Sequence, residues 1–290
     1  YIRMKVCGFT IIRNAVKYDY PVVEAITSIL PVCDKFIVLV GNSDDNTLEL
    51  IQSIDSEEII IQHSTWDDSL REGGRVLAIE TDKAKAFIPS DYNWAFYIQS
   101  DEVIHEKYHN IILQSMEKWK NDPNVDGLLF KYLHFYGSYD YVGTSRRWYR
   151  HEIRIIKNDP LIQSYRDAQG FRRKGKKLKV KPIDAYVYHY GWVKDPLTQA
   201  KKHKDFNKLW HDDQFVAQFT EKIYNYSDID YLETFDNTHP NVMKNRILQK
   251  NWDFDGKKLK SKVSFKDKFL FWLEQKTGIR LFEYKNYHII

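Results

Sequence analysis

The chain has 290 residues, and its 43% hydrophobic and 15% aromatic content is enough for a buried core and excludes global disorder. A net charge of +4, from 44 basic and 40 acidic residues, is weaker than the clustered excess of a nucleic-acid-binding domain, so we expect no nucleic-acid partner. The longest apolar runs, residues 6–12 and 36–40, are far shorter than the roughly 20 residues of a membrane-spanning helix.

Only two cysteines occur, Cys7 and Cys33, and both lie in apolar segments. Such usage is typical of a reducing compartment, and we expect a cytoplasmic protein. The modest positive charge also fits a peripheral contact with an anionic membrane surface at the inner face of the cell membrane.

The first hundred residues alternate between buried strands and helices. Apolar runs predict strands at residues 5–12, 36–40, 58–62 and 94–98, and helical spacing predicts helices at 21–30, 47–54 and 70–87. This order indicates an α/β fold with a mainly parallel, Rossmann-like sheet flanked by helices. Ligands of such sheets bind outside the carboxyl ends of the strands.

The pattern changes after a helix predicted at residues 110–120. Strands are predicted at 127–135, 152–156 and 185–189, and the chain from about residue 196 onward is predicted to be helical. We therefore expect a catalytic domain at residues 1–194 and a helical C-terminal extension, residues 195–290, packed on it.

Asp101 is the sharpest single candidate, because a buried strand at 94–98 releases the carboxylates of Asp101 and Glu102 at its exit. A divalent cation that bridges a diphosphate needs hard oxygen ligands of this kind. The alternative is a helix N-cap with an acidic first turn, in a helix that begins near Val103.

Four segments, taken in order, resemble the GT-A glycosyltransferases, in particular the inverting bacterial enzymes of family 2. They are residues 8–14 (GFTIIRN), 40–47 (VGNSDDNT), 73–78 (GGRVLA) and 99–102 (QSDE). The resemblance covers about the first hundred residues and implies a GT-A fold and a nucleotide-sugar donor, with UDP as the usual nucleotide. Gln99 departs from the family's D-x-D motif, in which the second acid, here Asp101, is the metal ligand; this weakens the expected dependence on Mn²⁺ or Mg²⁺.

His189 ends an apolar strand, and the resemblance implies that it completes the coordination of a metal held by Asp101. A buried histidine bonded to backbone is the alternative. The nucleotide-sugar site implied by the motifs and strand ends comprises Thr10, Arg13, Asn14, Asn42, Asp44, Asp45, Asp67, Arg75, Gln99, Ser100 and Trp192. For Asn42–Asp45 the alternative is an Asx-rich turn that caps the helix at Thr47.

An inverting transfer needs a general base that takes the proton of the acceptor hydroxyl. The resemblance places this base between the metal motif and the late histidine, where Asp167 lies in a loop-like segment. Glu102 is the second candidate and Glu152 the third. The alternative for Asp167 is an ion pair with Arg166 or Arg172.

Two further segments have several interpretations. The basic stretch at residues 172–181 is a solvated hairpin, a flap over a diphosphate, or a contact to an anionic acceptor or membrane. The tail at residues 263–273 places Phe265, Phe269, Trp272 and Leu273 on one helical face, which we expect to pack against the main domain, with a membrane surface as the alternative.

The sequence thus predicts an inverting glycosyltransferase of polysaccharide, lipopolysaccharide or glycoprotein synthesis, with a glycan, lipid-linked or protein acceptor. A nucleotidyltransferase is an alternative, although residues 9–16 lack the Gly-rich basic loop that such enzymes carry after the first strand. A non-catalytic nucleotide-sugar-binding module of the same fold is a second alternative, suggested by Gln99.

Overall fold

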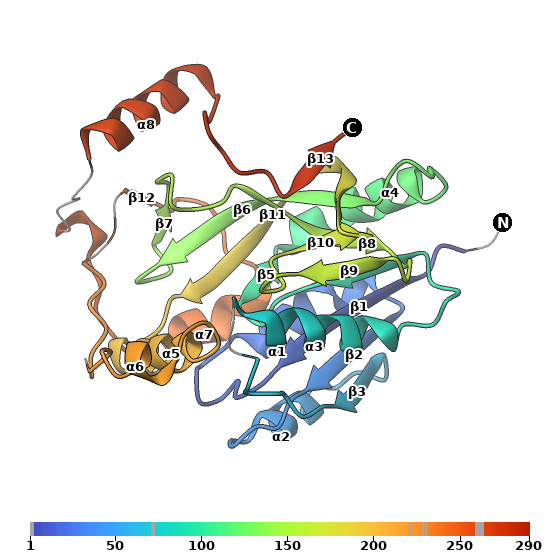
Figure 1. Ribbon diagram of the computed structural model, residues 1–290, viewed down its shortest axis with the longest axis horizontal. Helices are drawn as coiled ribbons and strands as arrows, with labels where there is room; N and C mark the ends of the chain where they lie inside the picture. The colour runs from blue at the N-terminus through green and yellow to red at the C-terminus, as the bar shows by residue number, and fades with distance from the viewer. Residues whose placement is uncertain (1–2, 71–72, 221, 228, 230, 259–263) are drawn as a thin grey trace.

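The computed structural model describes residues 3–70, 73–220, 222–227, 229, 231–258 and 264–290 (Figure 1). The strands are β1 Val6–Ile12, β2 Lys35–Val40, β3 Ile59–His63, β4 Trp94–Tyr97, β5 Glu102–Ile104, β6 Gly127–Tyr136, β7 Tyr141–Gly143, β8 His151–Lys157, β9 Ile162–Tyr165, β10 Gly170–Arg173, β11 Lys176–Trp192, β12 Leu232–Thr234 and β13 Tyr287–Ile289. The α-helices are α1 Val22–Ile29, α2 Thr47–Gln52, α3 Arg75–Ala86, α4 His109–Trp119, α5 Pro196–Asn207, α6 Asp213–Val216, α7 Lys244–Leu248 and α8 Phe265–Thr277.

The strands form one sheet in the order β3-β2-β1-β4-β8-β6-β11-β10-β9. The first four are parallel, as the alternation of strands and helices predicts. β8 is antiparallel to both β4 and β6, and β11 is parallel to β6. The two reversals bring β6 and β11 back to the direction of β1 and β4, so the carboxyl ends of these strands share one edge of the sheet. The expected α/β fold is confirmed.

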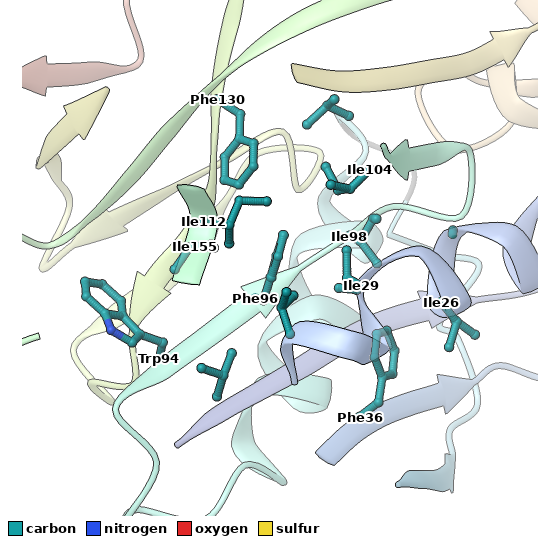
Figure 2. Close-up of a cluster of buried hydrophobic side chains, with 14 of the residues drawn as sticks. Ile26, Ile29, Phe36, Trp94, Phe96, Ile98, Ile104, Ile112, Phe130 and Ile155 are labelled. Atoms are coloured by element: carbon teal, nitrogen blue, oxygen red, sulfur yellow. The ribbon is translucent and has the colours of Figure 1, made fainter. Parts of the chain in front are cut away.

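Side chains of the central strands alternate between two cores, because successive residues of a strand point to opposite faces. On β2, Phe36, Val38 and Val40 enter one core with α1 and α4, and Figure 2 shows Phe36 there with Ile26 and Ile29 of α1. Ile37 and Leu39 enter the other core, which α3 covers. Burial on both faces explains why these strands are continuous apolar runs in the sequence.

One alternative interpretation and one predicted helix differ from the structure. Asp101 does not cap a helix at Val103: residues 102–104 are β5, which pairs with β11 in antiparallel register, Glu102 opposite His189, and a 3-10 helix begins only at Glu106. The helix expected at 70–87 is α3, which begins only at Arg75; Gly73 and Gly74 precede it at φ 60° and 69°, a left-handed conformation that glycine adopts without steric cost, and residues 71 and 72 lie outside the described residues.

The segment after residue 195 is only partly helical. Four α-helices lie in its described part, joined by irregular chain, and two of its segments are strands: β12 pairs with β7, and β13 pairs in parallel with β11. A domain boundary at residue 194 stays a prediction. β13 belongs to the main sheet (Figure 1), and residues of α5 line the cleft described below.

Candidate functional site

A cleft of about 830 Å³ opens where β1, β4 and β11 end, and α5 forms part of its wall. Its position agrees with the general rule that ligands of α/β sheets bind beyond the carboxyl ends of the strands. The structure brings together nine of the side chains predicted from the sequence; these are Arg13, Asn14, Asp44, Gln99, Ser100, Asp101, Asp167, His189 and Trp192.

Asp101 follows β4 and lines the cleft with a side chain that is only 13% exposed. The Lys202 ammonium lies 3.3 Å from Asp101 Oδ2, and His189 Nε2 lies 3.7 Å from Oδ1. Burial by itself raises the pKa of this carboxyl, but interactions with Lys202, His189 and Lys194 outweigh burial and lower the pKa to about 2. Asp101 is therefore a carboxylate at neutral pH.

His189 is oriented by a second histidine behind it. His134 Nε2 lies 2.8 Å from the carbonyl oxygen of Tyr149, and because a carbonyl only accepts, this nitrogen carries the hydrogen. Burial lowers the pKa of His134 well below its usual value, so the ring is neutral and its Nδ1 is an acceptor. His189 Nδ1, 3.3 Å away, is then the donor; burial lowers the pKa of His189, and in the neutral ring Nε2, 3.7 Å from Asp101 Oδ1, carries no hydrogen.

Asp101 Oδ1 and His189 Nε2, 3.7 Å apart, are the two atoms here that could hold a cation. Gly191 keeps this space open, because a Cβ there would lie 2.6 Å from Asp101 Oδ2 and 2.8 Å from His189 Nε2. Within the part of the chain that the structure describes, no three His, Cys, Asp or Glu side chains come together as a metal site. A metal ion held here would take two ligands from the protein, and a bound ligand or water would supply the others.

The opposite end of the cleft follows β1 and β2. Asn14 has φ 57°, and its side-chain oxygen accepts a hydrogen bond from the backbone N–H of Asp44. The Asp44 carboxylate is 65% exposed and pairs with Lys17, whose ammonium lies 2.9 Å away; this hydrogen bond helps to lower the pKa of Asp44. Arg13 pairs with Asp68, and its guanidinium lies 5.7 Å from the Trp66 ring. This end therefore presents polar and charged groups beside an indole ring.

Asp167 lies in the turn between β9 and β10, which presents it to the cleft. Its neighbours Arg166 and Ala168 have φ 58° and 62°, a conformation that costs energy in residues with a Cβ. Burial raises the pKa of the Asp167 carboxyl. No ion pair of Asp167 with Arg166 or Arg172 is present among the described residues; Arg172 instead donates to the carbonyl oxygens of Phe171 and Asn286.

Six predicted residues lie outside the lining of the cleft. Asp45 accepts hydrogen bonds from the backbone N–H and the hydroxyl of Thr47 and from the backbone N–H of Lys17. The bonds to Thr47 form the Asx-type turn that was the alternative for this loop. Asp67 caps its own turn through Ser69, so the adjacent Asp68 lines the cleft instead. Thr10 is buried within β1, Arg75 is exposed at the start of α3, and the side-chain oxygen of Asn42 accepts from the backbone N–H of Trp66.

Glu102 is the sixth residue of this group. It is fully buried, and its two oxygens accept from the Arg154 guanidinium, at 2.7 and 2.8 Å, and from the Tyr132 hydroxyl. A carboxylate so engaged cannot reach an acceptor hydroxyl, which leaves it a structural role. Glu152, the third candidate base, is 3% exposed and does not line the cleft either.

The wall formed by α5 is the main feature that the sequence did not predict. Gln199, Lys202, His203 and Phe206 line the cleft at spacing i, i+3, i+4, i+7, which places them on one face of the helix. The Tyr18 hydroxyl donates to Asp205, and Lys194 donates to the carbonyl of Asp19, so α5 and its approach are fastened to the loop after β1. The only signal in the sequence was this helical spacing, which also fits an ordinary half-solvated helix.

The basic stretch at 172–181 does not line the cleft. It forms the hairpin of β10 and β11, with Lys174 and Gly175 at φ 48° and 76° in the turn. Arg173 is paired with Asp126 and Asp159. The basic stretch therefore does not form a flap over the cleft. No helix in the described ranges is both long and apolar enough to cross a membrane.

Neither a protein-family model nor a curated protein matches the sequence significantly. Solved structures that match include TarS of S. aureus, at 14% identity and a TM-score of 0.41 over 74% of this chain and 42% of the TarS chain. TarS 1–349 in complex with UDP matches at 15% identity and a TM-score of 0.40, over 74% of this chain and 69% of that one.

Two other proteins also match. 4-Diphosphocytidyl-2C-methyl-D-erythritolsynthase from Anaerococcus prevotii has 10% identity and a TM-score of 0.40, over 71% of this chain and 95% of its own. Glucosyl-3-phosphoglycerate synthase from Mycobacterium tuberculosis, in complex with Mn²⁺, UDP and phosphoglyceric acid, has 15% identity and a TM-score of 0.30, over 45% and 43%.

Structural neighbours thus include glycosyltransferases of the GT-A type, the type that the strand-end motifs resemble. This chain spans less than half of the longer of these two TarS chains. All four TM-scores are below 0.5, so an activity for this chain has to be argued from its own cleft.

Proposed function

We propose that this chain is an inverting glycosyltransferase that moves a sugar from a UDP-sugar donor to a hydroxyl of a glycan, lipid-linked or protein acceptor. The observation that carries the proposal is the pair formed by Asp101 and His189 at the edge of the parallel strands, with His189 Nε2 3.7 Å from the carboxylate and His189 Nδ1 3.3 Å from His134. Such a pair, with Lys202 beside it, suits the diphosphate of a nucleotide sugar.

The donor lies across the cleft, with its nucleoside at the Asp44 end and its diphosphate beside Asp101. Asp44 accepts from the N–H of uracil or from ribose hydroxyls, and Gln99 and Ser100 bond the ribose. Arg13 contacts the nucleotide from the end of β1, and Trp192 offers a ring face on which the sugar stacks.

The protein atoms at this site fit a divalent metal. Asp101 and His189 Nε2 would hold Mn²⁺ or Mg²⁺, and such an ion, when bound, would offset the negative charge of the diphosphate. Lys202 already gives Asp101 a positive partner, so we expect UDP to bind with metal and, more weakly, without it.

Asp167 is the proposed general base. Its carboxylate removes the proton of the acceptor hydroxyl as that oxygen forms a bond to the anomeric carbon of the sugar. The bond from this carbon to the diphosphate oxygen breaks, and UDP leaves with both electrons of the bond. Lys202 lies where it offsets the charge that develops on the leaving diphosphate.

The compartment and pathway belong to the same proposal. A donor of this kind is consumed in polysaccharide, lipopolysaccharide or glycoprotein synthesis, and we infer a protein that works in the cytoplasm, in peripheral contact with the inner face of the cell membrane.

Calorimetric titration of UDP, with and without Mn²⁺, tests the donor site. The wild-type protein should bind UDP more tightly with Mn²⁺, and Asp101→Asn should lose the increment that Mn²⁺ adds. Lys202→Met should weaken metal-free binding by about tenfold, the effect of one charged hydrogen bond, and should retain the Mn²⁺ increment. Asp184→Asn, at an exposed carboxylate remote from the cleft, is the matched control.

Other outcomes separate the alternatives. Binding of UDP-sugars without transfer or hydrolysis would support a non-catalytic binding module. Release of pyrophosphate from a nucleoside triphosphate would indicate a nucleotidyltransferase. A wild-type protein that binds neither UDP nor GDP under any of these conditions would overturn the proposed donor site.

A further inference from the structure

Helix α8 leaves its aromatic side chains in solvent. Phe265, Phe269 and Trp272 lie at spacing i, i+4, i+7, which places them on one face, and they are 87%, 53% and 54% exposed. The rings of Phe269 and Trp272 stack with centroids 6.0 Å apart. Packing of this face against the main domain was expected from the sequence, and the structure shows otherwise; Leu273 is half-buried, and Val263 lies outside the described residues.

The opposite face of α8 holds the helix to the rest of the chain. Phe271 stacks on Tyr231 with ring centroids 4.4 Å apart, and Glu274 is buried in an ion-pair cluster with Arg146, Arg150 and Arg280. Phe271 follows Phe269 by two residues, and Glu274 follows Trp272 by two, which corresponds to about 200° of rotation around the helix. The anchored face therefore turns the aromatic face directly outward, and Figure 1 shows α8 at the edge of the molecule.

Charge on α8 is distributed to match an anionic surface. Lys266, Lys268 and Lys276 are all exposed, and helical spacing places Lys276 on the aromatic face itself. The acids face elsewhere: Asp267 accepts from the hydroxyl of Ser264 at the N-terminus of the helix, and Glu274 is neutralised by its arginines. The exposed part of α8 thus combines aromatic side chains with lysines, the residue types that bind the interface of an anionic membrane.

We propose that this surface, defined by Phe265, Phe269, Trp272, Lys268 and Lys276, docks the protein on a bilayer that contains anionic lipids. The helix is about 20 Å long and lies flat, with its aromatic rings at the level of the acyl chains and its lysines among the anionic headgroups. After α8, Phe282 adds another aromatic side chain that is 90% exposed. This inference names the surface behind the membrane contact proposed above, and it stands on α8 alone, independently of the proposed donor.

Sedimentation with vesicles tests the proposal. The wild-type protein should bind vesicles of equal parts phosphatidylcholine and phosphatidylglycerol, and should bind pure phosphatidylcholine vesicles much more weakly. Raising the salt from about 0.1 M to about 1 M should weaken binding to the mixed vesicles, since it shortens the screening length about threefold. The triple variant Phe265→Ser/Phe269→Ser/Trp272→Ser should lower the partition coefficient by about 100-fold, because three large apolar side chains no longer leave water.

Two matched controls separate this surface from general stickiness. Leu248→Ser removes an equally exposed apolar side chain from α7 and should leave vesicle binding unchanged. Lys268→Glu/Lys276→Glu should lose the preference for phosphatidylglycerol, whereas Lys174→Glu/Lys176→Glu, in the β10–β11 hairpin, should keep it. The thermal transition of each variant confirms that it is folded.

Three outcomes would overturn the membrane surface. These are no binding of the wild-type protein to the mixed vesicles, equal binding by the triple variant, and a wild-type dimer in sedimentation equilibrium that the triple variant loses. The last would assign the surface to a second copy of the chain. UDP titration of the triple variant keeps the two proposals apart, because an intact donor site should bind UDP whether or not α8 binds lipid.

Discussion

Asp167 owes its position to a backbone that two neighbours distort. Arg166 and Ala168 both take left-handed φ values, and the turn that results presents the carboxylate to the cleft. A sequence shows an aspartate in a loop, but it does not show that the residues on both sides of it give up their preferred conformation. Strain at such a position is consistent with a residue placed for chemistry.

We expect Asp167→Asn to lower kcat by about 10²–10⁴-fold, the usual contribution of a general base, while UDP binding stays unchanged. Burial raises the pKa of Asp167, and the base acts in its deprotonated form, so the rate of the wild-type protein should fall as the pH drops through a value above that of an ordinary aspartate. Initial rates across pH with a saturating donor measure both effects.

The control for this prediction is Arg166→Gly, which keeps the left-handed conformation at the neighbouring position and does not touch the lining of the cleft. Its kcat should equal that of the wild type. If Asp167→Asn retained the wild-type rate, Asp167 would not be the base. The same would follow if Asp167→Asn lost UDP binding together with its rate.

At the scale of elements, a buried ion pair joins strands that are distant in the sequence. Glu102 of β5 and Arg154 of β8 are both almost fully buried, and Tyr132 of β6 donates to the same carboxylate. Because the exit of β4 leads directly into β5, this pair also fixes the chain that carries Asp101. A charge left alone in such a place is costly, since no water replaces the lost partner.

Glu102→Gln should therefore lower the free energy of unfolding by about 3–5 kcal/mol, as measured by chemical denaturation. Asp184→Asn breaks the exposed pair of Lys131 on β6 with Asp184 on β11 in the same sheet, and should cost less than about 1 kcal/mol. The double variant Glu102→Leu/Arg154→Met, which leaves no buried charge, should be more stable than Glu102→Gln alone. Equal losses for Glu102→Gln and Asp184→Asn would contradict this account.

The strands at the centre of the sheet could be predicted because burial on both faces makes them continuous apolar runs. β11 could not be predicted at its full length: lysines and an aspartate interrupt residues 176–192, and only the apolar part near His189 reads as a strand. His189 and Trp192 could be predicted as candidates because they lie at the end of this apolar part. The reversal through β8, which brings His189 to the same edge as Asp101, depends on tertiary pairing that no local pattern records.

Over the whole molecule, the cleft combines residues that the sequence predicted with a wall that it did not. The end of a buried strand can be recognised in the sequence by a change from apolar to polar residues. Nine side chains predicted in this way or from the late histidine segment and the Asp167 loop line the cleft. Lys202 and its neighbours come from α5, about a hundred residues after Asp101, and only the fold of the C-terminal segment brings them there. Which of two neighbouring residues lines the cleft depends on the direction of its side chain, which the sequence does not show; Asp68, and not Asp67, lines the cleft.

Glu152 should make the stability of the whole protein depend on pH. Burial raises the pKa of its carboxyl to about 8, and its Oε2 has no hydrogen-bond partner among the described residues. Between the unfolded value of about 4.3 and the folded value, the native state holds a proton that the unfolded state has released, so the contribution of Glu152 to stability falls as the pH rises. The limiting slope for one such group is about 1.4 kcal/mol per pH unit.

Other titrating groups make stability rise with pH, so the quantity to measure is the difference in the free energy of unfolding between Glu152→Gln and the wild type. Burial lowers the pKa of Lys194 to about 7; above that pH the unfolded state holds more protons than the native state, and stability rises with pH. Glu152→Gln removes the carboxyl and leaves Lys194 in place. Urea denaturation from pH 5 to about pH 8 should therefore show the variant gaining stability relative to the wild type as the pH increases. A difference that stays constant over this range would mean that Glu152 is ionised in the native state at neutral pH and finds a partner when it is charged.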